Sequence, residues 1–255
     1  MEILTSLEGP VLRLQINRPE KRNALTLGMY EQLTSALQEA DRNPAVRVVL
    51  IHGHPDGFTS GNDLKDFAQS PPVGVDSPVG RFITAISTAR KPLVAAVAGP
   101  AVGIGMTMLL HCDFVYAAEN TRFQAPFVNL ALLPEAGSSL LLPMQIGYLR
   151  AARLLMLGEP FSAAMALQYG LVTEVSADAA AALKAAQAAA AQLSAKPAAA
   201  LHLIKMLLKR PHAEQLATQI GEETRHFVEQ LRSPEAVEAF KAFSEKRAPN
   251  FAQFA

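Results

Sequence analysis

Hydrophobic residues follow two different patterns along this chain, and the change occurs near residue 134. Before it, short apolar runs that end at turn residues alternate with helical patterns. The runs predict strands at 11–17, 46–51, 92–98 and 113–118, and the patterns between them predict helices at 26–43 and 103–111. Beyond it the strand signals fade, and helical spacing predicts helices at 138–145, 148–157, 162–169, 179–194, 198–209, 213–231 and 234–245. Strands alternating with helices, then helices alone, predict an α/β core with a C-terminal helical appendage.

Two segments have a biased composition. Residues 70–80 are rich in proline and glycine, which predicts an exposed loop. The alanine-rich run at 179–194 has the composition of a biased segment, but alanine is the best helix former and Leu183 and Leu193 give the segment an apolar face. A helix is therefore the better prediction there.

Composition narrows the class of protein. The 255 residues are 50% hydrophobic, which is ample for a large core. Lys+Arg and Asp+Glu both number 23, so nothing indicates a nucleic-acid partner. The one cysteine, Cys112, excludes an internal disulfide, and its apolar neighbours favour a buried core residue over a nucleophile. The histidines are scattered, so no metal site is predicted.

The first ten residues lack the basic and apolar regions of a signal peptide. The chain has no apolar stretch approaching the roughly 20 residues of a membrane helix. We therefore expect a soluble protein of a reducing compartment, the cytoplasm, with no membrane partner.

One acidic residue lies where an acid is energetically costly. Glu135 is the only charge between residues 130 and 143, a run rich in leucine. Removing a carboxylate from water raises its pKa, which suits a group that transfers protons near neutral pH. The plainer interpretation is that Pro134 and Glu135 start a helix, where an acid complements the helix dipole.

Two small-residue turns are candidates for binding an anion. In 58–64 a strand ends and a helix begins, and the backbone N–H groups of such a turn have no internal partner. In 97–106 Gly103 and Gly105 flank Ile104 and would let a ligand approach the backbone. The first turn could also be an ordinary strand–helix connection, and the second could also reflect tight helix packing. The second is not a dinucleotide-binding fingerprint, because its third glycine is missing.

Taken together, the two turns and Glu135 would make one reaction site. Two N–H donors from separate turns can form an oxyanion hole, which lowers the cost of negative charge on a thioester oxygen. A carboxylate beside the adjacent carbons can then remove a proton and return it. This set is sufficient to move a double bond along an acyl chain.

With these motifs in fixed order, the chain resembles the crotonase (enoyl-CoA hydratase/isomerase) family over nearly its whole length. The resemblance rests on residues 17–25 (Asn-Arg-Pro-Glu-Lys-Arg-Asn-Ala-Leu), 60–64 (Ser-Gly-Asn-Asp-Leu) and 103–105 (Gly-Ile-Gly). It implies a ClpP-like ββα superhelix in residues 1–195 that contains the active site. It also implies a helical subdomain in residues 196–255 that serves in trimerisation or covers the active site.

The same resemblance assigns roles to individual residues. It places the oxyanion-hole amides at Asn62 and Ile104. It implies an acyl-CoA substrate, and no separate cofactor, since CoA is part of the substrate. It gives the following substrate-binding positions: Lys21, Arg22, Ser60, Gly61, Asp63, Leu64, Lys65, Gly103, Phe127 and Leu130.

The chain departs from the hydratase pattern at two positions. Hydratases of this family use two glutamates to activate water, and here Thr107 and Phe127 stand in their places. Glu135 is the acid that remains. This combination resembles the peroxisomal-type Δ3,Δ2-enoyl-CoA isomerases, in which the matching glutamate is the catalytic base and the residue matching Asn62 orients it. The implied reaction converts a 3-enoyl-CoA to the 2-trans-enoyl-CoA.

The sequence is also compatible with other functions. The chain could be an enoyl-CoA hydratase or another crotonase-fold enzyme, or a non-enzymatic binder of acyl-CoA or of RNA. The resemblance implies a homotrimer or a dimer of trimers. The apolar residues Phe227, Leu231, Phe240 and Phe243 would suit such a contact, or equally packing within one chain.

Overall fold

The main sheet of the protein has six strands, in the order β1-β2-β3-β4-β6-β9. The computed structural model describes residues 2–69 and 74–254. The pair β1–β2 is antiparallel and every other pair is parallel. The strands are β1 Ile3–Glu8, β2 Val11–Ile16, β3 Val48–His52, β4 Leu93–Val97, β6 Phe114–Ala118 and β9 Glu174–Ser176.

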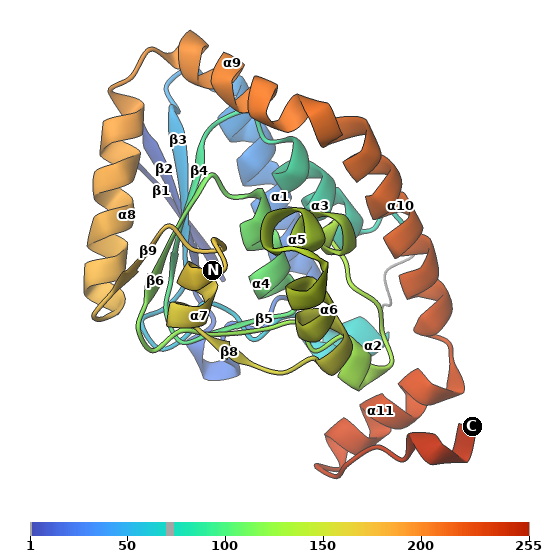
Figure 1. Cartoon of the computed structure of the whole chain (residues 1–255). Helices are drawn as coiled ribbons and strands as arrows, with labels where there is room; N and C mark the ends of the chain where they lie inside the picture. The colour runs from blue at the N-terminus through green and yellow to red at the C-terminus, as the bar shows by residue number, and fades with distance from the viewer. Residues whose placement is uncertain (1, 70–73, 255) are drawn as a thin grey trace.

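The central strands β3 and β4 are buried along their whole length, because helices cover both faces of the sheet. Helix α8 (Ala179–Ser194) lies on one face, and α1 (Leu27–Arg42) and α3 (Pro78–Thr88) lie on the other (Figure 1). Small side chains let α8 approach closely: Ala186 and Ala190 belong to the same buried cluster as Val48 and Val94. The alanine-rich run is thus a packed helix, as predicted.

A second, three-stranded sheet lies at one end of the first. It consists of β5 (Pro100–Val102), β7 (Arg122–Gln124) and β8 (Phe161–Ser162), in that order. Strands β4 and β6 of the main sheet are followed directly by β5 and β7 of the small one, and β5 leads into α4 (Ile104–Thr107). This strand–strand–helix succession is the ββα unit that the sequence resemblance predicted.

The remaining helices lie close to their expected positions. The long helix expected at 103–111 is divided into α4 and a 3-10 turn, Met108–His111. Further short 3-10 turns occupy Pro19–Lys21, Val128–Leu130, Arg210–His212 and Phe251–Phe254. The other α-helices are α2 Leu64–Gln69, α5 Ser138–Ile146, α6 Tyr148–Leu157, α7 Ala163–Gln168, α9 Ala198–Lys209, α10 Ala213–Gln230 and α11 Pro234–Ser244.

The prediction of helices alone beyond residue 134 was wrong at β8 and β9. These strands have two and three residues, too few for an alternating pattern, and pairing with β7 and β6 is what makes them strands. Strand β1 was also missed. Part of the loop expected at 70–80 falls on 70–73, outside the described residues, and α3 begins within it at Pro78, capped by Ser77.

The C-terminal helices form a strap around the body. Helix α9 passes along one end of the sheet, α10 runs down the side next to α5, and α11 with the C-terminus lies apart from the sheet (Figure 1). Among the described residues, no helix combines the length and the apolar character that crossing a membrane requires. The division at residue 195 stays a prediction.

Candidate active site

The two small-residue turns lie side by side. Thr59 and Ala101 form a parallel bridge, in which Val102 N–H donates to the Thr59 carbonyl at 3.0 Å. Asn62 and Ile104 each lie three residues beyond this bridge, so their amides reach the same edge. Within the described part of the chain, no hydrogen bond engages either amide. Both residues line one cavity, where free N–H groups could receive an oxygen.

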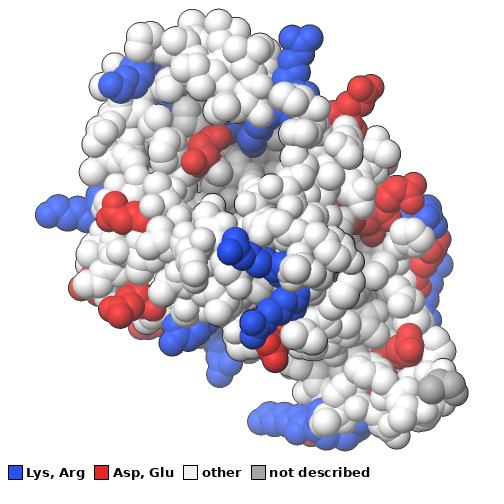
Figure 2. Space-filling model, in the orientation of Figure 1, with Lys and Arg blue, Asp and Glu red and all other residues white. Residues whose placement is uncertain are grey.

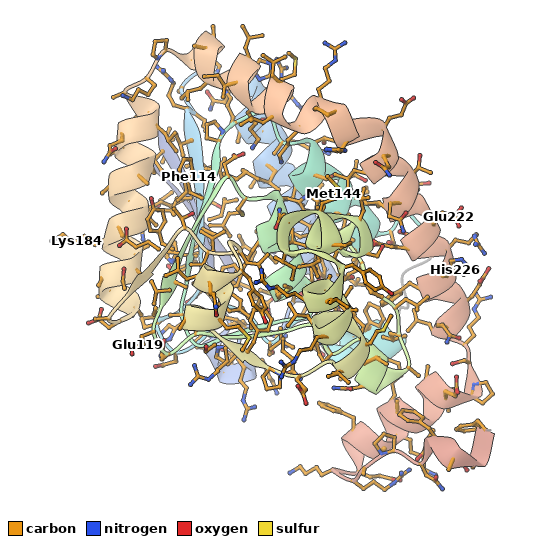
Figure 3. The ribbon with its side chains drawn as sticks, viewed as in Figure 1. Phe114, Glu119, Met144, Lys184, Glu222 and His226 are labelled. Atoms are coloured by element: carbon orange, nitrogen blue, oxygen red, sulfur yellow. The ribbon has the colours of Figure 1, made fainter. Side chains whose placement is uncertain are left out.

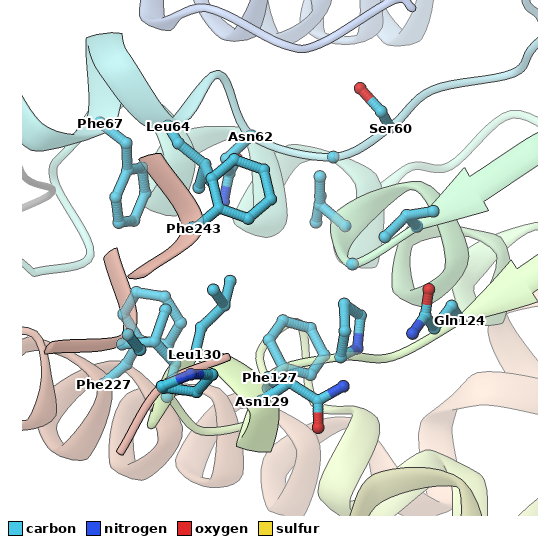
Figure 4. Close-up of a pocket in the computed structure, with 18 of the residues that line it drawn as sticks. Ser60, Asn62, Leu64, Phe67, Gln124, Phe127, Asn129, Leu130, Phe227 and Phe243 are labelled. Carbon is cyan, nitrogen blue, oxygen red and sulfur yellow. The ribbon is translucent and has the colours of Figure 1, made fainter. Parts of the chain in front are cut away.

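That cavity has a volume of about 380 Å³ and mostly apolar walls (Figure 4). Eight residues predicted from the sequence line it: Ser60, Gly61, Asn62, Leu64, Gly103, Ile104, Phe127 and Leu130. Its other walls include side chains that sequence reasoning missed: Phe67, Gln124, Asn129, Leu132, Phe227, Phe243 and Arg247. The last three come from α10, α11 and the segment after it, which only the folded chain brings to this place.

A more polar hollow of about 590 Å³ adjoins the cavity and shares Ser60, Asn62, Leu64 and Phe243 with it. Lys21 and Arg22, both exposed, lie on its rim. Predicted Asp63 also lines it, and its carboxylate accepts from Arg18 at 2.7 Å. The side chain of Lys65 lies outside the described residues.

Asn23 attaches the loop that carries Lys21 and Arg22 to the segment before the first turn. Its buried amide nitrogen donates to the carbonyls of Gly57 and Phe58 at 2.9 and 3.1 Å, and its side-chain oxygen accepts from Arg18 N at 2.6 Å. It adopts a left-handed conformation, with φ 56°, which asparagine tolerates better than most residues. Sequence reasoning did not single it out.

Glu135 is 6% exposed, and its Oε1 atom is buried without a hydrogen-bond partner among the described residues. Burial raises its pKa to about 8, and the negative charge of Glu223 contributes second. The competing expectation, a pKa held down by a helix start at Pro134, fails because α5 begins at Ser138. Glu135 is not among the side chains that line the cavity.

Tyr30 is hydrogen-bonded to Asn62 and lies near enough to Glu135 to be affected by its charge. Its hydroxyl donates to Asn62 Oδ1, which turns the amide nitrogen of Asn62 toward the cavity (Figure 4). Burial raises the pKa of Tyr30 above its usual range, and the charge of Glu135 adds to this shift. Tyr30 is therefore a neutral donor that lies close to both residues, and the sequence had not revealed it.

Thr107 and Phe127, at the two positions where the hydratase pattern has glutamates, have structural roles in this chain. Thr107 is fully buried, and its hydroxyl donates to the Gly103 carbonyl at 3.3 Å. Phe127 is part of the apolar wall. Among the described residues, none of the side chains lining the cavity is a carboxylate.

Comparison with known proteins gives a consistent result. The family model described as enoyl-CoA hydratase/isomerase matches residues 7–254. The 1,2-epoxyphenylacetyl-CoA isomerase of Escherichia coli is 34% identical over 98% of this chain and 97% of its own. Enoyl-CoA delta isomerase 2 of Rattus norvegicus is 38% identical over 180 residues. The matched region covers 68% of this chain and 46% of that protein. The crystal structure of an enoyl-CoA hydratase/isomerase from Pseudoalteromonas atlantica superposes with a TM-score of 0.93 at 41% identity, covering 98% of this chain and all of that one. The predicted fold is thereby confirmed.

Proposed function

Because the chain belongs to the enoyl-CoA hydratase/isomerase family, we propose that it moves the double bond of a 3-enoyl-CoA to the 2-trans position. The observation that carries the proposal is one buried carboxylate without a hydrogen-bond partner, Glu135, together with a cavity whose lining includes no carboxylate among the described residues. The similarity to an enoyl-CoA delta isomerase supports the same reaction.

In the proposed mechanism the thioester oxygen accepts hydrogen bonds from the amides of Asn62 and Ile104. Glu135 in its ionised form removes a proton from C2, and the electron pair moves onto the thioester oxygen as a dienolate. The two amides stabilise this charge where it develops. Glu135 then delivers the same proton to C4, which leaves the double bond between C2 and C3. The carboxylate ends ionised, and no cofactor is consumed.

The raised pKa of Glu135 serves both halves of this mechanism. A carboxylate deprived of water and donors is a stronger base toward C2, and once protonated it holds the proton long enough to deliver it to C4. Phe127, Leu130 and Leu132 form an apolar wall that would exclude competing water. Lys21 and Arg22, at the polar hollow, would bind the phosphates of CoA.

The proposal is tested by incubating the protein with a 3-enoyl-CoA and identifying the product by NMR. We expect 2-trans-enoyl-CoA to accumulate. A 3-hydroxyacyl-CoA would mean that isomerisation is followed by hydration of the 2-trans product. Unchanged 3-enoyl-CoA would contradict the isomerase, and 2-trans-enoyl-CoA offered in its place then separates a hydratase, which forms 3-hydroxyacyl-CoA, from a binding protein, which does not. An RNA-binding role has little support, because Lys and Arg are interspersed with Asp and Glu on the face shown in Figure 2 and form no continuous stripe there.

We further propose that copies of the chain associate through α9. Its outer face exposes Leu203, Ile204, Leu207 and Leu208, each more than half exposed, at helical spacing. Such a stripe is typical of a protein–protein interface. Of the residues considered for this contact from the sequence, Phe227 is buried in the core and Leu231 and Phe240 pack against it, whereas Phe243 is 62% exposed.

The change Leu208→Glu is expected to lower the mass in solution, because it places a charge on the exposed apolar face of α9. Light scattering should give three or six times 27.3 kDa for the wild type, and a smaller mass for the variant. Lys184→Glu, on the exposed side of α8, is the matched control and should leave the mass unchanged. A wild-type mass equal to one chain would contradict the proposal.

A further inference from the structure

The turn between Glu135 and α5 is held by a side chain from the C-terminal strap. Glu223 on α10 accepts hydrogen bonds from the backbone N–H groups of Gly137 (2.6 Å) and Ser139 (2.9 Å), and from the Ser139 hydroxyl. Gln219, one helical turn earlier, donates to the same hydroxyl at 2.9 Å. Glu223 thus joins α10 to the start of α5.

Every backbone N–H group from Gly137 to Leu141 has an acceptor. Gly137 and Ser139 donate to Glu223, and the other three amides donate to the backbone oxygens of Glu135 and Gly137 at 2.9–3.1 Å. The first amides of a helix are the ones that ordinarily stabilise a nearby carboxylate. None of these amides is left for the Glu135 side chain, which agrees with its unpartnered Oε1 atom.

We propose that Glu223 is a positioning residue for Glu135: it occupies the amides at the start of α5 and so keeps the Glu135 carboxylate without a donor. The inference rests on the proposed isomerase function, because it concerns the strength of the base. Two effects act in the same direction. Glu223 removes the donors that would stabilise ionised Glu135, and its own charge adds to burial in raising the pKa of Glu135.

In the part of the chain that the structure describes, three titratable side chains face Glu135 or its turn, each from a different element. Tyr30 of α1 is neutral, as its raised pKa shows. His111, in the 3-10 turn after α4, lies with Nε2 2.8 Å from the Ala136 carbonyl, and burial, then Lys209, lower its pKa to about 4, so it is neutral as well. Glu223 from α10 accepts from donors at both oxygens, which is the behaviour of an ionised carboxylate. Burial raises its pKa, and these hydrogen bonds oppose that shift.

The test is the pH dependence of kcat/KM for isomerisation in Glu223→Gln. Only ionised Glu135 starts the reaction, so the wild-type rate rises with pH through the pKa of Glu135. We expect the midpoint to move down by about one unit or more in the variant, because the charge is lost and an amide becomes available. Glu222→Gln is the matched control: it lies next along the helix, exposed and paired with Arg225, and should not move the midpoint (Figure 3).

A ¹³C-carboxyl NMR titration of Glu135, assigned with Glu135→Gln, measures the same pKa without substrate. If the wild type does not isomerise 3-enoyl-CoA, the proposed function fails, and the titration still tests the inference. If the Glu135 midpoint is the same with and without Glu223, the inference is wrong even where activity falls. Should Glu223→Gln not fold, Glu223→Asp takes its place: the charge remains but no longer reaches both amides, so the Glu135 midpoint should again move down, and an unchanged midpoint would overturn the inference.

Discussion

Replacing Glu135 by glutamine is expected to slow the conversion of 3-enoyl-CoA by about 10²–10⁴-fold or more, since a positioned acid/base group contributes this much. Binding of the CoA thioester should persist, because glutamine has nearly the same shape and the amides of Asn62 and Ile104 are untouched. Single-turnover rates and calorimetric titration with a substrate analogue separate the two effects. Unchanged turnover would remove Glu135 from the mechanism.

The same variant tests the electrostatics of the site through stability. Burial raises the pKa of Glu135 to about 8, so the folded state favours the protonated carboxyl more than the unfolded chain does. The contribution of this group to stability is fully present below the unfolded pKa, near 4.5, and is lost as the pH rises through 8. Melting temperatures at pH 5 and pH 9 should therefore differ less in Glu135→Gln than in the wild type.

The change Gly103→Ala is expected to lower kcat by about 10²–10³-fold, the usual effect of losing one oxyanion-hole donor. Gly103 has φ 57° and ψ −122°, a backbone conformation open to glycine and costly for other residues. A Cβ there would meet no atom within 4 Å, so the effect is backbone strain and not a steric clash. Relief of that strain rotates the peptide that carries the Ile104 N–H group. We expect a loss of stability of about 1–3 kcal/mol.

Gly9→Ala is the matched control for this strain. Gly9 lies in the turn between β1 and β2 with φ 56°, and a Cβ there likewise meets nothing within 4 Å. It does not line the cavity. The control should therefore lose stability but keep its specific activity. Equal activity losses in the two variants would mean that the Ile104 amide has no special role.

Local sequence patterns were enough to single out Glu135 and the two turns, and to predict the inner core. Glu135 was conspicuous as a charge among leucines and the glycines marked the two turns, whereas the choice of Asn62 and Ile104 within them came from the family resemblance. The buried strands β3 and β4 were apparent as uninterrupted apolar runs. In each of these cases the physical cause, burial or a backbone conformation that only glycine adopts readily, acts within a few residues.

What the sequence could not reveal depends on contacts between distant segments. The resemblance implied that residues 196–255 serve in trimerisation or cover the active site, but not that Phe227 and Phe243 line the cavity; they reach it because the C-terminal strap folds back over it. Strand β9 exists because β6 offers it an edge. Glu223 did leave a signal: it interrupts the apolar stripe that Leu216, Ile220 and Phe227 form on α10 at helical spacing. An acid in such a stripe predicts a buried partner, but not which one.

The central claim is that one carboxylate moves a proton here and that water is not added. The most direct test compares initial rates of 3-enoyl-CoA isomerisation and 2-trans-enoyl-CoA hydration, with the same enzyme preparation and the same acyl length. We predict ready isomerisation and very poor hydration. Hydration at a rate equal to or above that of isomerisation would contradict the account.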